Sequence, residues 1–112
     1  MLTASMIDKT STPDHSEFDL CHPLAPLDAK RAIQSIVVDG QVAYSRHAIV
    51  EMANDELTSV DVVNVLRGGI ADPAEWENGS WRYRVRTQRM CVVVVIRSGS
   101  ELKVITAWRF RS

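Results

Sequence analysis

The chain has 112 residues, of which 46% are hydrophobic and 24% charged, with a formal net charge of −1. This length predicts one small domain with a single hydrophobic core, and no stretch approaches the roughly 20 apolar residues that span a bilayer. Met1–Cys21 has no hydrophobic signal core, and Cys21 and Cys91 are too few and too far apart for a disulfide framework or a zinc motif. We therefore expect a cytoplasmic protein without a membrane partner, a metal site or a cofactor.

The charges are distributed unevenly along the chain. Residues 80–112 contain eight basic residues and one acidic residue, whereas residues 1–79 contain five basic and thirteen acidic residues. This asymmetry indicates an anionic partner for the basic part. The alternative is that the acidic half packs against the basic half and neutralises it.

Residues 1–25 show no hydrophobic periodicity and are predicted to form a mobile tail ahead of a single domain at 26–112. The first helix is predicted at Pro26–Asp39, because apolar residues recur at helical spacing and Gly40 follows its end. Gln41–Tyr44 reads as a short extended link.

Two further helices are predicted next. Ser45 suits the N-cap of a helix at Arg46–Asn54. Thr58, with Asp61 three residues later, resembles a capping box that opens a helix at Ser59–Leu66. The predicted buried stripes of these helices are Ile49, Met52 and Ala53 in the first, and Val60, Val63 and Leu66 in the second.

The rest of the chain is predicted to form antiparallel strands. Ile70–Trp76 contains Pro73 and reads as an edge strand. Ser80–Gln88 alternates between apolar and polar residues, Met90–Arg97 is an apolar run typical of a central strand, and Leu102–Phe110 alternates again. The predicted fold class is therefore α+β, with two or three N-terminal helices on one face of an antiparallel meander of three or four strands.

Alternation with a period of two assigns the side chains of the outer strands to faces. In the first of these strands it places Arg82, Arg84 and Arg86 together, opposite Trp81 and Tyr83. In the last strand it places Lys103, Arg109 and Arg111 on the same face as those arginines, and Thr106 and Trp108 on the other. Trp81, Tyr83 and Trp108 either pack in the core or stack on bases.

Two groups of residues suggest chemistry. His47 is the one histidine of the predicted folded part, and imidazole suits acid–base chemistry near neutral pH; the alternative is a surface histidine. Alternate arginines on a strand lie roughly 6.5–7 Å apart, close to one nucleotide of extended backbone. Guanidinium groups bind phosphate in a bidentate manner, so the row formed by Arg82, Arg84 and Arg86 is suited to binding RNA. The alternative is that these arginines form a solvated outer face.

Several segments, taken in order, resemble the bacterial domain-of-unknown-function family 4258. They are Tyr44–Met52, Val60–Leu66, Trp81–Val85 and Val104–Arg109. The most specific parts are the His-Ala pair at a helix start and the terminal Thr-x-Trp-Arg pattern, and the resemblance covers roughly residues 41–109. The family looks related to RelE- and BrnT-like ribonuclease toxins, which place helices before an antiparallel sheet. One departure is that a frequent Met-x-x-Arg pattern is replaced here by Met52-Ala-Asn-Asp-Glu56.

The resemblance implies a toxin that cleaves RNA without a metal and is held inactive by an antitoxin protein. The residues that match the family's polar positions, and would be catalytic, are His47, Arg84, Thr106 and Arg109. Further residues expected to bind RNA are Arg46, Arg82, Arg86, Lys103 and Arg111. The residues leave open two other hypotheses: a non-catalytic module that binds nucleic acid or an acidic protein, and an interaction module whose basic face is covered by its own acidic tail or a partner subunit.

Overall fold

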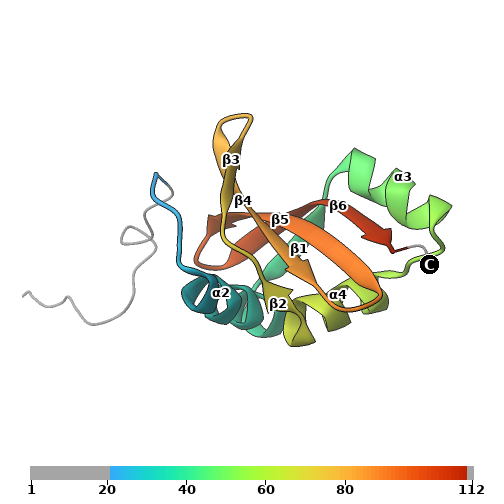
Figure 1. Ribbon diagram of the computed structural model, residues 1–112, viewed down its shortest axis with the longest axis horizontal. Helices are drawn as coiled ribbons and strands as arrows, with labels where there is room; N and C mark the ends of the chain where they lie inside the picture. The colour runs from blue at the N-terminus through green and yellow to red at the C-terminus, as the bar shows by residue number, and fades with distance from the viewer. Residues whose placement is uncertain (1–20, 111–112) are drawn as a thin grey trace, which may run out of the picture.

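The computed structural model describes residues 21–110, which form three helices and six strands of an α+β fold (Figure 1). In chain order these elements are α2 (Pro26–Asp39), β1 (Gln41–Tyr44), α3 (Arg46–Asn54), α4 (Ser59–Gly68), β2 (Ile70–Ala71), β3 (Glu75–Glu77), β4 (Ser80–Arg86), β5 (Met90–Ser98) and β6 (Glu101–Arg109). None of the described helices is long and apolar enough to cross a membrane.

The strands form one sheet in the order β1-β6-β5-β4-β2, with β3 also paired to β4. The apolar strand β5 is central, as its sequence predicts, and β4 and β6 flank it in antiparallel orientation. Pro73 separates β2 from β3, and both short strands pair with β4 at the edge predicted for this segment. The sheet thereby contains more strands than the meander expected from the sequence.

The segment predicted as a link, Gln41–Tyr44, is instead strand β1, which pairs in parallel with β6. The backbone N–H of Gln41 donates to the carbonyl of Ser100 at 2.8 Å, and that of Ser45 donates to the carbonyl of Val104 at 2.9 Å. Four residues are too few to show an alternation, and the pairing partner lies far along the chain. The local sequence therefore could not reveal this strand.

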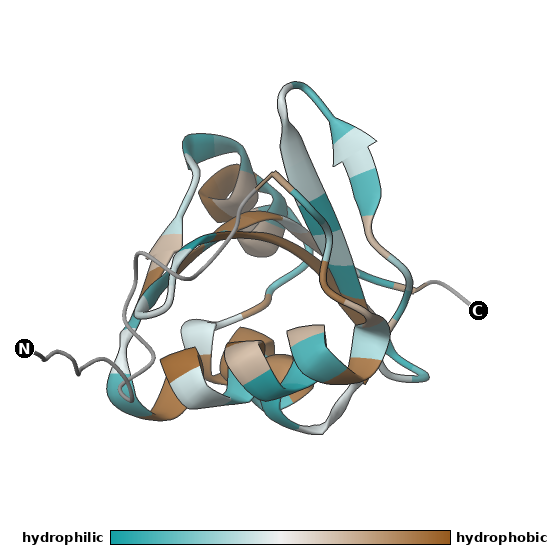
Figure 2. Ribbon diagram, turned by 90° about the vertical axis from the view of Figure 1, so that its left-hand side faces the viewer, coloured by the Kyte–Doolittle hydropathy of each residue, from teal (hydrophilic) through white to brown (hydrophobic). Residues whose placement is uncertain are grey.

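Helices α2 and α4 run beneath the strands, and apolar residues are concentrated in the central strands above them (Figures 1 and 2). This face of the sheet contributes the fully buried side chains of Val85, Val92, Val94, Leu102 and Val104. Ile33 and Ile36 from α2 and Val62 and Leu66 from α4 complete the same core. Tyr83 is buried there too, and its hydroxyl accepts a hydrogen bond from the N–H of Leu24 at 2.9 Å.

Both predicted helix caps are confirmed. Ser45 Oγ accepts the N–H of Ala48 at 2.9 Å. Thr58 and Asp61 form a reciprocal capping box. The predicted buried stripes are wrong in part: α3 buries Ala48 and Met52 while Ile49 is exposed, and α4 buries Val62, Val65 and Leu66 while Val60 is exposed. Both helices are apolar on more than one side, so helical spacing alone could not choose the buried face.

The predicted tail falls partly within the described residues. The carbonyl of Cys21 accepts a hydrogen bond from Trp81 Nε1 at 3.1 Å. This bond and the one from the N–H of Leu24 to Tyr83 place residues 21–24 against the start of β4. Trp81 itself packs against the core cluster. Residues 1–20 of the predicted tail lie outside the described part.

A β-bulge in β6 changes the face of every side chain that follows it. Val93 of β5 pairs with Thr106, but the next residue, Val94, pairs with Val104, so Ile105 is the additional residue of β6. A shift of one residue moves all later side chains to the opposite face. The predicted faces of Thr106, Trp108 and Arg109 are therefore wrong. Thr106 and Trp108 lie on the face of the β4 arginines, Ala107 is buried in the core, and Arg109 turns away from the arginines.

Candidate functional site

The face of the sheet opposite α2 and α4 carries three cross-strand rows, each running from β4 through β5 to β6. The rows are Arg82–Val95–Lys103, Arg84–Val93–Thr106 and Arg86–Cys91–Trp108. Each row has an arginine at one end, an apolar side chain in the middle and a polar or aromatic side chain at the other end. We call this surface the basic face.

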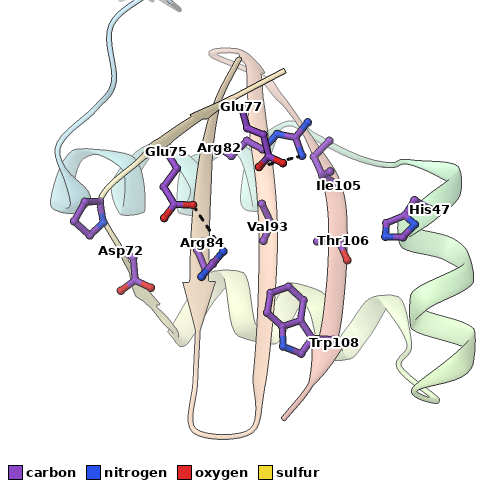
Figure 3. A pocket seen from close by; sticks show the side chains of 11 residues that line it. His47, Asp72, Glu75, Glu77, Arg82, Arg84, Val93, Ile105, Thr106 and Trp108 are labelled. Atoms are coloured by element: carbon purple, nitrogen blue, oxygen red, sulfur yellow. Dashed lines mark ion pairs between the residues drawn. The ribbon is translucent and has the colours of Figure 1, made fainter. Parts of the chain in front are cut away.

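An open cavity of about 290 Å³ lies on this face (Figure 3). Its lining combines β4, β5 and β6 with the first turn of α3 and with the segment that contains β2 and β3. The lining residues are His47, Asp72, Pro73, Glu75, Glu77, Arg82, Arg84, Val93, Ile105, Thr106 and Trp108. Segments far apart in the sequence therefore meet at one cavity.

Ser45 determines where His47 stands. Its Oγ accepts the N–H of Ala48 and also donates to the carbonyl of Ile105 at 2.8 Å. Ile105 is the bulge residue, so one hydroxyl both starts α3 and joins it to the bulge. His47 follows two residues later and lies beside Thr106 at the edge of the cavity (Figure 3).

The side chain of His47 is 65% exposed, and its Nε2 lies 3.8 Å from Oε2 of Glu51, one helical turn further along α3. That separation is longer than a hydrogen bond. The imidazole is thus accessible to a ligand in the cavity.

All three β4 arginines face acidic side chains from the preceding edge segment. Arg86 Nε donates to both carboxylate oxygens of Asp72, at 3.2 and 3.0 Å, and this hydrogen bonding raises the pKa of Arg86. Arg84 lies 3.8 Å from Glu75, and Arg82 lies 4.0 Å from Glu77. Part of the basic strand is therefore neutralised by acidic residues of the same chain, as the alternative interpretation of the charge asymmetry expects.

Arg82 is the most enclosed of these arginines, with a side chain that is 19% exposed. Its Nε is buried and has no hydrogen-bond partner within residues 21–110. A buried donor without a partner is unfavourable. An acceptor group of a bound ligand would satisfy it.

The structure brings together four of the predicted site residues, His47, Arg82, Arg84 and Thr106, at one cavity. Arg86 and Lys103 share the basic face by strand register but do not line the cavity. Arg46 is exposed at the first position of α3 and is also outside the lining. Arg111 lies outside the described residues.

Arg109, which was predicted to be catalytic, does not line the cavity. Its backbone N–H donates to a carboxylate oxygen of Asp55 at 2.8 Å. Its side chain donates to the carbonyls of Asp55 and Glu56 at 3.4 and 3.5 Å. The bulge has turned it toward the end of α3, where these hydrogen bonds join β6 to the helix.

The acidic residues at the rim were missed by sequence reasoning, and Trp108 was considered only as a residue that packs in the core or stacks on bases. For the acids a signal did exist: Glu75-Trp76-Glu77 alternates and precedes the turn signal Asn78-Gly79, which predicts a hairpin with β4. The exposed Trp76 stacks edge to face on Trp81 at 5.3 Å and so lies on the side of β3 away from the cavity. For Trp108 no local signal gave the correct face, because its position depends on the bulge.

Among residues 21–110, no three histidine, cysteine, aspartate or glutamate side chains are grouped so that they could hold a metal ion. Cys91, in the middle of one row of the basic face, is buried, and desolvation raises its pKa to about 11. Its thiol is therefore protonated at neutral pH and unsuited to nucleophilic attack.

Comparison with known proteins gives one match. The family model described as "Domain of unknown function (DUF4258)" matches residues 44–109, from the end of β1 to the end of β6. No curated protein and no solved structure matches the chain. The matched segment contains every residue that lines the cavity.

Proposed function

This chain belongs to the DUF4258 domain family, and from the geometry of its cavity we propose that it is a metal-independent ribonuclease of the RelE/BrnT-like toxin class. The proposal rests on one observation: a titratable imidazole and two arginines line the same open cavity, with Thr106 between His47 and Arg84 (Figure 3). An antitoxin protein would then be its partner.

The arrangement suits cleavage by the ribose 2′-OH. Arg82 and Arg84 would hold the scissile phosphate and stabilise the charge that develops on its oxygens. The 2′ oxygen loses its proton and bonds to phosphorus, while the bond from phosphorus to the 5′ oxygen breaks and that oxygen takes up a proton. His47 would transfer one of these two protons, and the Thr106 hydroxyl would orient the phosphate. The products are a 2′,3′-cyclic phosphate and a 5′-OH.

The surroundings of His47 favour a second candidate, a module that binds RNA without cleaving it. Catalytic imidazoles are usually oriented by a hydrogen bond from a third group. Within the described residues, the partner of His47 is Glu51 at 3.8 Å, so no such bond fixes its ring. In this candidate the arginines act as in the first, and His47 contributes no chemistry.

The decisive experiment incubates the purified protein with labelled single-stranded RNA in EDTA and compares it with His47→Ala and with Asn54→Ala. Asn54 is exposed on the same helix and does not line the cavity, so it serves as the matched control. Loss of acid–base catalysis should reduce the cleavage rate of His47→Ala by roughly 10²–10⁴-fold with little change in RNA affinity. If the wild-type protein binds RNA and leaves it intact, the ribonuclease proposal is wrong and the binding module takes its place.

A further inference from the structure

We infer that Glu75 and Glu77 of β3 compete with RNA phosphates for Arg82 and Arg84, and thereby lower the affinity of the site for RNA. We call these two glutamates the acidic strap. The inference rests on the proposed function, because it concerns how the same site is regulated.

The three arginine–carboxylate pairs of β4 differ in kind. Arg86 and Asp72 share two hydrogen bonds, at 3.0 and 3.2 Å, and form a geometrically closed pair. The Arg84–Glu75 and Arg82–Glu77 pairs stand 3.8 and 4.0 Å apart, beyond hydrogen-bond length. The strap thus balances the charge of two guanidinium groups without satisfying their donors.

The guanidinium donors that the strap leaves without a protein partner are available to a better acceptor. Within residues 21–110 neither the Arg82 nor the Arg84 guanidinium makes a hydrogen bond, and the Arg82 Nε is buried. Phosphate oxygens accept short charge-assisted hydrogen bonds from guanidinium groups. An RNA phosphate would therefore gain hydrogen bonds that the strap does not make, while replacing the strap's negative charge.

The strap is able to yield without unfolding. The side chains of Glu75 and Glu77 are 68% and 60% exposed, and β3 is a three-residue strand at the sheet edge. Exposed side chains change rotamer within nanoseconds. Trp76 packs on Trp81 from the side of β3 away from the cavity, so the β3 backbone keeps its place on β4 while the carboxylates rotate out.

The test compares three proteins by fluorescence anisotropy with a labelled single-stranded RNA oligonucleotide at low salt. The strap variant is Glu75→Gln with Glu77→Gln, which keeps the shape and removes both charges. The control is Asp28→Asn with Asp39→Asn, which makes the same change in net charge on the exposed side of α2, across the sheet from the cavity. Thermal unfolding of all three checks that they are folded.

Release of two ion pairs whose carboxylates are exposed should tighten RNA binding by the strap variant about 2- to 30-fold. The control should stay within about twofold of wild type at moderate salt. If wild type and control bind RNA and the strap variant binds no more tightly than the control, the competition is refuted and the proposed function stands. If none of the three binds RNA, the proposed function itself fails, and the role of the strap fails with it.

Discussion

The guanidinium carbon of Arg84 lies 5.9 Å from the centre of the Trp108 indole ring. This cation–π contact joins β4 to β6 across the central strand, and it exists because the bulge at Ile105 turns Trp108 onto the basic face. The indole holds Arg84 over the cavity while the guanidinium edge stays available to a ligand. Arg84 is therefore positioned by packing, whereas Arg86 is positioned by its hydrogen bonds to Asp72.

Arg84→Ala should weaken binding of single-stranded RNA roughly tenfold, because one charge-assisted phosphate contact is lost. The slope of log affinity against log salt should become shallower by about one unit. Anisotropy titrations over a series of salt concentrations measure both quantities. An unchanged slope would mean that Arg84 does not contact phosphate.

Arg109→Ala serves as the contrasting change, since Arg109 bonds to the end of α3 and not to the cavity. Its RNA affinity and salt slope should match those of wild type. Its two long side-chain hydrogen bonds are exposed, so unfolding free energy should fall by less than about 1 kcal/mol. Chemical denaturation measures this loss of stability. A large drop in RNA affinity would show instead that Arg109 contributes to RNA binding.

Val94→Asp should prevent stable folding. Val94 is fully buried in the central strand, between β4 and β6, and a carboxylate there has no partner. The cost is on the order of 4 kcal/mol or more, comparable to the whole stability of a small domain. Circular dichroism during thermal unfolding should show no cooperative transition.

The neighbouring substitution Val95→Asp provides the control for that experiment. Val95 lies on the basic face, in the row between Arg82 and Lys103, so an aspartate there faces two cations. This variant should unfold cooperatively with a midpoint close to that of wild type. Equal damage from both substitutions would contradict the assignment of the two faces of β5.

Asp61 should contribute stability that depends on pH. Its carboxylate accepts the backbone N–H and the hydroxyl of Thr58, and these hydrogen bonds lower the pKa of Asp61 from its ordinary value of 3.8. A lowered pKa in the folded state gives stability that is present above 3.8 and is lost as the pH falls through the folded pKa.

Thermal unfolding of wild type and Asp61→Asn from neutral pH downward measures this contribution. Wild type should melt at the higher temperature near neutral pH, and the difference should shrink in acid as Asp61 becomes protonated. A difference that does not change with pH would show that the charge of Asp61 is unimportant to the capping box.

Cys91 should resist alkylation in the folded protein. Its pKa of about 11 leaves roughly 100-fold less thiolate at neutral pH than an ordinary cysteine has, and burial blocks access as well. Iodoacetamide labelling followed by mass spectrometry should modify the exposed Cys21 first and Cys91 only after denaturation. Equal labelling rates would indicate that β5 opens readily.

Much of the fold follows from local rules of the chain. The side chains of Ser45 and Thr58 accept hydrogen bonds from backbone N–H groups that have no partner within the helix. Helices α3 and α4 begin directly after these two residues, as predicted. The unbroken apolar run of β5 requires cover on both faces, which makes it central. Alternation along β4 places its three arginines on one face, and this follows without knowing which strands pair with β4.

Other features of the site depend on contacts between distant segments. The face that carries Thr106 and Trp108 depends on one additional residue in β6, and a count with a period of two has no means of detecting such an insertion. The bulge is joined to α3 by the hydrogen bond from Ser45 to the carbonyl of Ile105, sixty positions away in the chain. The sequence alone therefore singled out Arg82, Arg84 and His47, which line the cavity. Tertiary structure decided that Trp108 lines it too, that Arg109 does not, and that carboxylates from the sheet edge face the arginines.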